Sequence, residues 1–222
     1  MDREPGKLGT YNFQGCKYGS WTVWYYLVVS DLYLLGNQKC LEQKRIAVVG
    51  TRTMSEYGRQ MTEVFVRRLV EDDWCIVSGL ARGVDRVAHE TALKYHGLTM
   101  AVLGHGVDLC YPSEHLGLKK RILENKGLVV SEYDQGVRAT PDKFRVRDRL
   151  MVHLADCVLV MESPRRSGVK ITVSAAAEEG KSVYVVPGPV NQASYHGSVE
   201  IIRNGGIPVY SPNDLLEQLK FL

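Results

Sequence analysis

Short apolar runs that alternate with amphipathic stretches constrain the fold of this 222-residue chain more than any other feature. Continuous apolar runs of this length are typical of strands buried on both faces of a parallel sheet. Strands that alternate with helices along a chain predict an α/β fold, a doubly wound, mostly parallel sheet with helices on both faces. The expected strands are 31–37, 45–50, 74–77, 99–103, 128–131, 157–161, 183–186 and 207–210, and the expected helices are 55–72, 84–96, 115–125, one near Leu150, and 214–220.

Length and composition indicate an ordinary globular protein with one large domain. We expect a domain over residues 31–222, preceded by an appendage over residues 1–30 whose sequence shows no clear periodicity. The net charge of +3 is too small to indicate a nucleic-acid partner by itself. Five widely spaced cysteines without a C-x-x-C pattern suggest neither a disulfide framework nor a metal site, and they fit a cytoplasmic protein. The longest apolar stretch, Trp21 to Ser30, is too short to cross a membrane.

The octet Ser78 to Asp85 follows an expected strand and opens an expected helix. Glycine lets a backbone approach an anion closely, and a helix N-terminus presents free N–H groups and the positive end of its dipole. We therefore expect Ser78, Gly79 and Gly83 to lie at a phosphate, with Arg82 adding a planar fork of donors. The alternative is a tight turn between strand and helix with a solvated arginine.

Dinucleotide and ATP binding are not favoured. The turn after the first parallel strand reads Gly50-Thr51-Arg52-Thr53 and lacks the G-x-G-x-x-G fingerprint. No G-x-x-x-x-G-K-[ST] segment occurs either. We expect no cofactor.

Two further segments concentrate cations. In Lys143 to Arg149, four cations surround Phe144. Arginines that hold phosphates beside an aromatic ring that stacks on a base form the usual grip on single-stranded nucleic acid. The alternative is a solvated basic loop with Phe144 in the core. Arg165, Arg166 and Lys170 follow a later strand, with a solvated turn as the alternative.

These residues together resemble the DNA-processing protein A family, also called DprA or Smf, which protects incoming single-stranded DNA in natural transformation and hands it to a RecA-type recombinase. The matching segments occur in order from about residue 30 to the C-terminus. They are Gly50-Thr51-Arg52, Ser78 to Asp85 with His89, Gly104 to Asp108 with Tyr111-Pro112, Ser131-Glu132, Phe144 with Arg147 and Arg149, Asp156, Glu162, Ser167-Gly168, Thr172, and Pro187-Gly188 with Gly197.

The resemblance implies an extended Rossmann-like fold, a homodimer and sequence-independent binding of single-stranded DNA, with no catalytic or metal-binding residue. DNA contacts would fall on Arg52, Arg82, Phe144, Arg147, Arg149 and Lys170. The wider superfamily offers an enzymatic alternative, a nucleotide phosphoribohydrolase or nucleotide sensor. Its acids and bases would come from Asp108, Glu132, Glu162 and His89, although the P-G-G-x-G-T segment of such hydrolases is missing.

The sequence departs from the family pattern at Asp148, where the family usually has asparagine. A carboxylate between Arg147 and Arg149 has two opposite roles available. It can pair with an arginine, or it can repel an approaching phosphate. We expect repulsion to dominate, so that Asp148→Asn tightens DNA binding. Lys170 also stands where the family usually has leucine.

Overall fold

The computed structural model describes residues 9–11, 32–189 and 191–222. Its nine strands form one sheet in the order β1-β2-β6-β5-β4-β3-β7-β8-β9. The strands are β1 (Gly9–Tyr11), β2 (Leu32–Gly36), β3 (Arg45–Gly50), β4 (Cys75–Ser78), β5 (Thr99–Leu103), β6 (Leu128–Ser131), β7 (Cys157–Glu162), β8 (Val183–Val185) and β9 (Ile207–Pro208). Strands β3 to β9 pair in parallel, whereas β1 and β2 run antiparallel at one edge.

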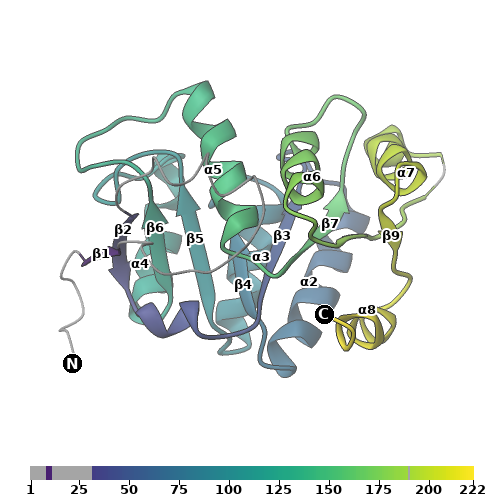
Figure 1. Ribbon diagram of the computed structural model, residues 1–222, viewed down its shortest axis with the longest axis horizontal. Coiled ribbons are helices and arrows are strands. Elements are labelled where there is room, and N and C mark those ends of the chain that lie inside the picture. The colour runs from purple at the N-terminus through teal and green to yellow at the C-terminus, as the bar shows by residue number, and fades with distance from the viewer. Residues whose placement is uncertain (1–8, 12–31, 190) are drawn as a thin grey trace.

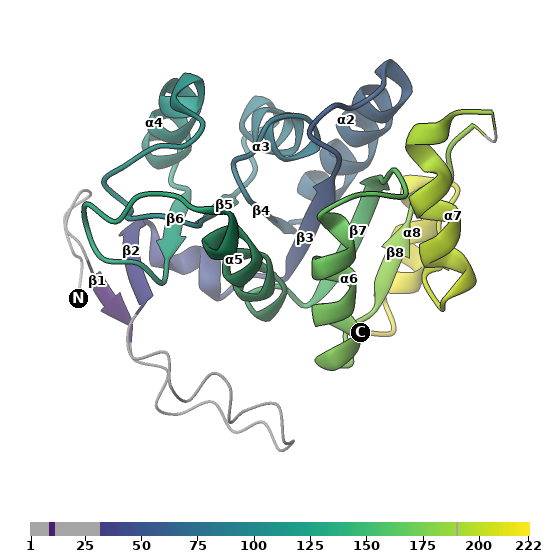
Figure 2. The same cartoon turned by 90° about the horizontal axis from the view of Figure 1, so that it is seen from above.

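Helices cover both faces of the sheet, as Figures 1 and 2 show. The helices are α2 (Glu56–Glu71), α3 (Val84–Lys94), α4 (Leu116–Glu124), α5 (Pro141–His153), α6 (Val169–Glu178), α7 (His196–Arg203) and α8 (Pro212–Leu219), with short 3-10 turns at Gln38–Leu41, Ser113–His115 and Ala193–Tyr195. The predicted α/β class with a mostly parallel, doubly wound sheet is therefore confirmed.

The period of two along each strand divides the core between the faces. On β3, Ile46 and Val48 pack with α2, α3 and α8, and Ala47 and Val49 pack with α5 and α6. Both sets are fully or almost fully buried. The central strands are apolar between their ends because both faces of the sheet are covered. Their polar residues stand at strand ends: Arg45, Ser78, Thr99, Ser131 and Glu162.

The basic stretch 143–149 lies in a helix, α5, and not in the solvated loop that the sequence left as an alternative. Helix α5 begins at Pro141, two residues before the stretch, with the extended residue Thr140 at its N-cap. Proline is favoured in the first turn of a helix because its fixed φ suits the helix and its missing N–H would have no partner there. Phe144 and Arg147 therefore lie one turn apart on one side of α5.

Two helices, α6 and α7, were not predicted from the sequence. Helix α6 follows Ser167-Gly168, in a segment for which the sequence left a solvated turn as an alternative, and α7 contains Gly197 and Ser198 in its first turn. These residues are weak helix formers, so local propensity did not indicate a helix, and packing on the sheet decides the conformation.

The N-terminal segment contributes to the sheet. Gly9–Tyr11 forms β1 and pairs antiparallel with β2. The rest of residues 1–30, including the apolar stretch Trp21 to Ser30, lies outside the described residues. The proposed boundary near residue 30 remains a prediction.

Candidate nucleic-acid interface

The site lies at the carboxyl rim of the sheet, where the strand order reverses between β3 and β7. Gly50 at the end of β3 pairs with Glu162 at the end of β7. The chain leaves β3 toward α2 on one face and leaves β7 toward α6 on the other (Figure 2). Ligands of open α/β sheets bind in the crevice that such a reversal creates.

The turn after β4 fits the rim closely because of its glycines. A Cβ on Gly79 would lie 1.4 Å from the guanidinium Nη1 of Arg147, and a Cβ on Gly83 would lie 2.2 Å from the carbonyl oxygen of Thr51. Gly83 also has a φ of +73°, which disfavours other residues. The turn after β4 thus packs directly against the turn after β3.

The N–H groups of this turn are partly occupied by the protein itself. The N–H groups of Gly79 and Ala81 donate to Oδ2 of Asp85, at 3.1 and 3.3 Å. The hydroxyl of Ser78 is fully buried and donates to the carbonyl of Val48 at 2.7 Å. The sequence predicts a phosphate contact for Ser78 and Gly79. In the structure these particular donors have internal partners, and the phosphate contact remains a prediction.

Arg147 lies beneath this turn and is only 4% exposed. Its Nη1 donates to the carbonyl of Val102 at 3.3 Å and lies 3.9 Å from Oδ2 of Asp85, and its Nε lies 2.9 Å from Oδ1 of Asp148. Burial raises the pKa of the Asp85 and Asp148 carboxyls, and the Arg147 charge opposes the rise. Asp85, Arg147 and Asp148 are called the inner rim cluster below.

Asp148 therefore takes the pairing role that the sequence left open. Its effect on an approaching phosphate stays a prediction. The sequence predicted that Arg147 contacts DNA, and this contact remains a prediction. In the structure its guanidinium is buried among Val102, Asp85 and Asp148 and supports the turn from below.

Phe144 is half-buried near the start of α5, beside cations and a second ring. Its ring centroid lies 5.4 Å from the guanidinium carbon of Arg52, 5.8 Å from that of Arg147 and 5.5 Å from the ring of Tyr111. These distances are typical of cation–π and aromatic contacts. Tyr111 is 51% exposed. Phe144, Arg52 and Tyr111, called the Phe144 cluster below, combine charge with aromatic surface at the rim.

Of the remaining predicted cations, Arg82 and Lys170 are exposed and Arg149 is partly exposed, and each is paired with a carboxylate. Arg82 pairs with Glu114 at 2.6 Å, Arg149 with Glu178 at 2.5 Å and Lys170 with Glu200 at 3.1 Å. Arg82 and Lys170 lie at the rim, in the turn after β4 and in the first turn of α6. Arg149 lies away from the rim. Its partner Glu178 is the last residue of α6, nine residues or about 14 Å along the helix from Val169, where α6 begins.

The four groups considered for acid–base chemistry have different surroundings. Glu162 is fully buried and accepts hydrogen bonds from the N–H and hydroxyl of Ser55, both at 2.9 Å, at the start of α2. Burial lowers the pKa of His89 to about 3, so its imidazole is neutral. Burial raises the pKa of Glu132 to about 7, whereas the exposed Asp108 accepts from the N–H of Gly136 at 3.0 Å.

A cavity of about 500 Å³ lies on the other side of α3, between α2 and α3. Arg59, Arg86 and Lys94 alternate there with Glu63 and Glu90. Several of these charges pair within their own helix, including Arg59 with Glu63 and Arg86 with Glu90. Three cations and two carboxylates line the cavity, which leaves an excess of only one positive charge.

Within residues 9–11, 32–189 and 191–222, no group of three or more histidine, cysteine or acidic side chains is arranged to hold a metal ion. Over the same residues, no helix has the length and hydropathy needed to cross a membrane.

Fold and rim together define a Rossmann-like protein whose carboxyl rim carries arginines and aromatic rings. The model of one family, described as DNA recombination-mediator protein A, matches residues 13–220. Protein Smf of Escherichia coli K12 is 37% identical over 190 residues, which cover 86% of this chain and 51% of that protein. The chain thus spans about half the length of this curated relative.

Two solved structures are also similar. DNA processing protein A from Streptococcus pneumoniae superposes with a TM-score of 0.85 at 34% identity, over 95% of this chain and 74% of that one. DNA processing protein A from Helicobacter pylori, described for its single-stranded DNA binding mode, superposes with a TM-score of 0.76 at 29% identity, over 85% and 86%. The chain belongs to the DNA recombination-mediator protein A family, as its resemblance to DprA and Smf predicted.

The structure adds residues to the rim that the sequence analysis did not assign to it. Tyr111 was noted only as part of a matching segment, and its contact with Phe144 joins residues 33 apart in the chain. Glu114 and Glu200 were not singled out, although each pairs with a predicted cation. Exposed carboxylates are common, and spacing alone does not show which of them reaches the rim.

Proposed function

We propose that the protein binds single-stranded DNA without sequence preference at the carboxyl rim. The observation that carries the proposal is the Phe144 cluster, in which Arg52 and Tyr111 flank a half-buried phenylalanine at the carboxyl rim. An aromatic ring beside a guanidinium can stack on any base while the cation meets a phosphate. The similarity to the DNA processing protein A of Helicobacter pylori supports this proposal.

The enzymatic alternative receives less support from the rim. Glu162 is buried and bonded to Ser55, and His89 is buried and neutral, so neither is presented to a substrate. The start of α2, where a dinucleotide's pyrophosphate would bind in a Rossmann fold, already holds the Glu162 carboxylate. We therefore propose a binding protein rather than a nucleotide hydrolase.

A titration with labelled oligonucleotides tests the proposal. Single strands should bind more tightly than duplex of the same sequence, and log affinity should fall with log salt by about 0.7 for each neutralised phosphate. Arg52→Ala should weaken binding, and the matched control Arg59→Ala should not, because Arg59 is an exposed arginine of α2 paired with Glu56 and Glu63. Equal affinity for duplex, or binding insensitive to salt, would contradict the proposal.

Incubation with nucleoside monophosphates tests the enzymatic alternative directly, since release of free base would support it.

Membership of the family also leads us to propose a homodimer and a RecA-type recombinase as partner. Light scattering after size exclusion measures the first. For the second, the protein is immobilised with and without single-stranded DNA and recombinase retention is compared.

We further expect a cytoplasmic protein, because the four cysteines in the described residues, Cys40, Cys75, Cys110 and Cys157, are all free thiols. Cell fractionation checks this expectation.

A further inference from the structure

We propose a second phosphate-binding site at the rim, formed by Arg165, Arg166 and Lys170 and called the β7 patch below. A single strand would reach it only after extending beyond the Phe144 cluster. The inference rests on the proposed DNA binding. It adds the path of the bound strand, from the Phe144 cluster to the β7 patch, and a minimum strand length for contact with both. The three residues occupy the loop after β7 and the first turn of α6.

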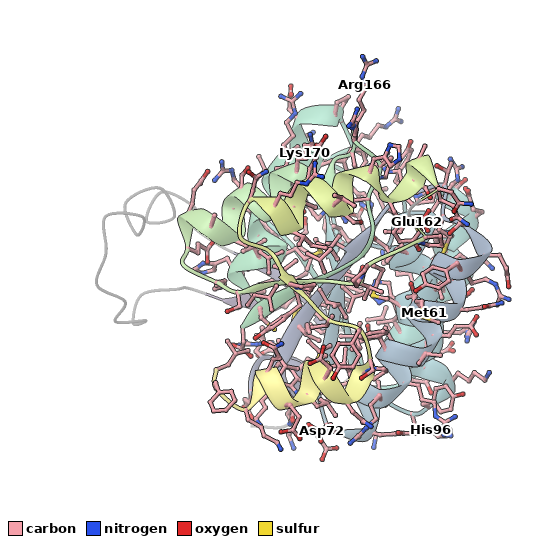
Figure 3. All side chains as sticks on the ribbon, turned by 90° about the vertical axis from the view of Figure 1, so that its right-hand side faces the viewer. Met61, Asp72, His96, Glu162, Arg166 and Lys170 are labelled. Atoms are coloured by element: carbon pink, nitrogen blue, oxygen red, sulfur yellow. The ribbon has the colours of Figure 1, made fainter. Side chains whose placement is uncertain are left out.

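The β7 patch carries more positive charge than its surroundings neutralise. The Nε of Arg165 and the Nζ of Lys170 each lie 3.1 Å from one oxygen of the same carboxylate, that of Glu200 on α7. The hydrogen bond from Lys170 lowers the pKa of Glu200, which is therefore ionised at neutral pH. In the part of the chain that the structure describes, Arg166 has no hydrogen bond or ion pair. Figure 3 shows Arg166 projecting from the molecule above Lys170.

The loop that carries the patch is held in place. The N–H of Ser198 donates to the carbonyl of Ser163 at 3.0 Å, and the N–H of Ser163 donates to the hydroxyl of Ser198 at 3.1 Å. A Cβ on Gly197 would lie 2.3 Å from the carbonyl oxygen of Pro164, so this glycine lets α7 pack directly on the loop. Arg165 and Arg166 thus extend from an ordered backbone, and binding loses less conformational entropy.

The patch and the Phe144 cluster share one rim. Arg52 follows Gly50 by two residues and Arg165 follows Glu162 by three, and Gly50 and Glu162 are partners in the sheet. In Figure 3, Arg166 and Lys170 lie at the end of the molecule opposite Asp72 and His96, which precede β4 and β5 at the amino rim. A strand held at Phe144 and Arg52 would cross the switch point to reach the patch.

The chemistry of the patch suits a phosphate backbone. Arg165 and Lys170 are 69% and 53% exposed, and ion pairs at such exposure are weak because water and salt screen them. A phosphate can therefore replace Glu200 as the partner of either cation. Arginine forks fit phosphate oxygens in pairs and read no base, so the site would be independent of sequence.

Oligothymidylates of about 4 and about 16 nucleotides, lengths that bracket typical single-strand site sizes, test the proposal. The variant Arg165→Ala/Arg166→Ala/Lys170→Ala should bind the short oligonucleotide like the wild type and the long one more weakly. Its salt slope on the long oligonucleotide should be shallower by about 0.7 for each phosphate that the variant no longer neutralises. Glu200→Gln should tighten binding of the long oligonucleotide only.

The matched controls are Lys220→Ala and Glu217→Gln, which alter an exposed Lys–Glu pair on and next to α8 at 2.7 Å. Neither should change binding at either length. Equal weakening of short and long oligonucleotides by the triple variant, or no weakening of the long one, would overturn the proposal while leaving DNA binding intact. Absence of single-strand binding by the wild type would instead overturn the proposed function on which this inference rests. Thermal melts confirm that all variants fold.

Discussion

The inner rim cluster and the exposed cations of the rim hold their charges in different ways. Arg147 is buried between Asp85 and Asp148, whereas Arg82 pairs with Glu114 at the surface with its side chain 63% exposed. In a buried cluster, each charge needs the others because water is excluded. At the surface, water stabilises each charge and the pair contributes little. We therefore expect the buried arginine to support the fold and the exposed ones to be available to a ligand.

The largest effect should come from Arg147→Ala, which leaves two buried carboxyls without their cation. Removing one partner of a buried ion pair typically costs about 3–5 kcal/mol of stability. A denaturant titration measures this loss. The matched control is Arg149→Ala, two residues further along α5, whose exposed pair with Glu178 should contribute about 0–1 kcal/mol. Equal losses of unfolding free energy in the two variants would contradict the proposed difference between buried and exposed cations.

Phe144→Ala should have the next largest effect, on binding. Loss of a stacked aromatic ring typically costs about 1–3 kcal/mol per base. Phe144→Tyr and Phe144→Trp should retain most of the affinity, and fluorescence anisotropy with a labelled single strand measures all three. Normal binding by Phe144→Leu, together with an unfolded Phe144→Ala, would show instead that this ring serves the core.

Arg82→Ala should reduce binding by one ionic contact and barely change stability. The salt slope for single-stranded DNA should become shallower by about 0.7. Exposed substitutions usually alter the free energy of unfolding by about 0.5 kcal/mol or less. Circular dichroism melts beside binding titrations at several salt concentrations separate the two quantities. A marked loss of stability without a change in the salt slope of DNA binding would show that Arg82 stabilises the fold and does not contact phosphate.

Asp148→Asn should have the smallest effect, visible mainly in its pH dependence. Burial raises the pKa of Asp148 in the folded protein, so the folded state holds its proton to higher pH than the unfolded chain. The contribution of Asp148 to the free energy of unfolding is therefore complete below the pKa that this residue has in the unfolded chain. It is lost as pH rises through the pKa that the residue has in the folded protein. The asparagine variant should match the wild type in strong acid and become more stable than it toward neutral pH.

Melting temperatures of both proteins from about pH 3, below the ordinary carboxyl pKa, to about pH 7 check this sign. A less stable asparagine variant at neutral pH would show that the attraction to Arg147 exceeds the cost of burying Asp148.

The sequence was sufficient for the central strands because each is an apolar run with polar residues only at its ends, and each is followed by a turn signal. It did not predict β1. It could not show which face of α5 would be buried. Arg147 and Arg149 look alike in the sequence, yet the first reaches under Gly79 and the second pairs with Glu178. Burial of an arginine depends on partners that come from distant segments, here Val102 and Asp85. The glycines of the turn after β4 indicated close approach, and the structure shows a protein group near each of them. Arg147 approaches Gly79, and the backbone of Thr51 approaches Gly83.

The carboxylate of Glu162 at the start of α2 has a consequence for competition inside a cell. Free nucleotides and dinucleotides are abundant there, and many Rossmann folds bind them at the start of the first helix. In this protein that position holds a side chain that is covalently part of the chain, at an effective concentration no free anion can match. We therefore expect the rim to be insulated from changes in the cellular nucleotide pool, so that its occupancy follows the supply of nucleic acid and not the energy state of the cell.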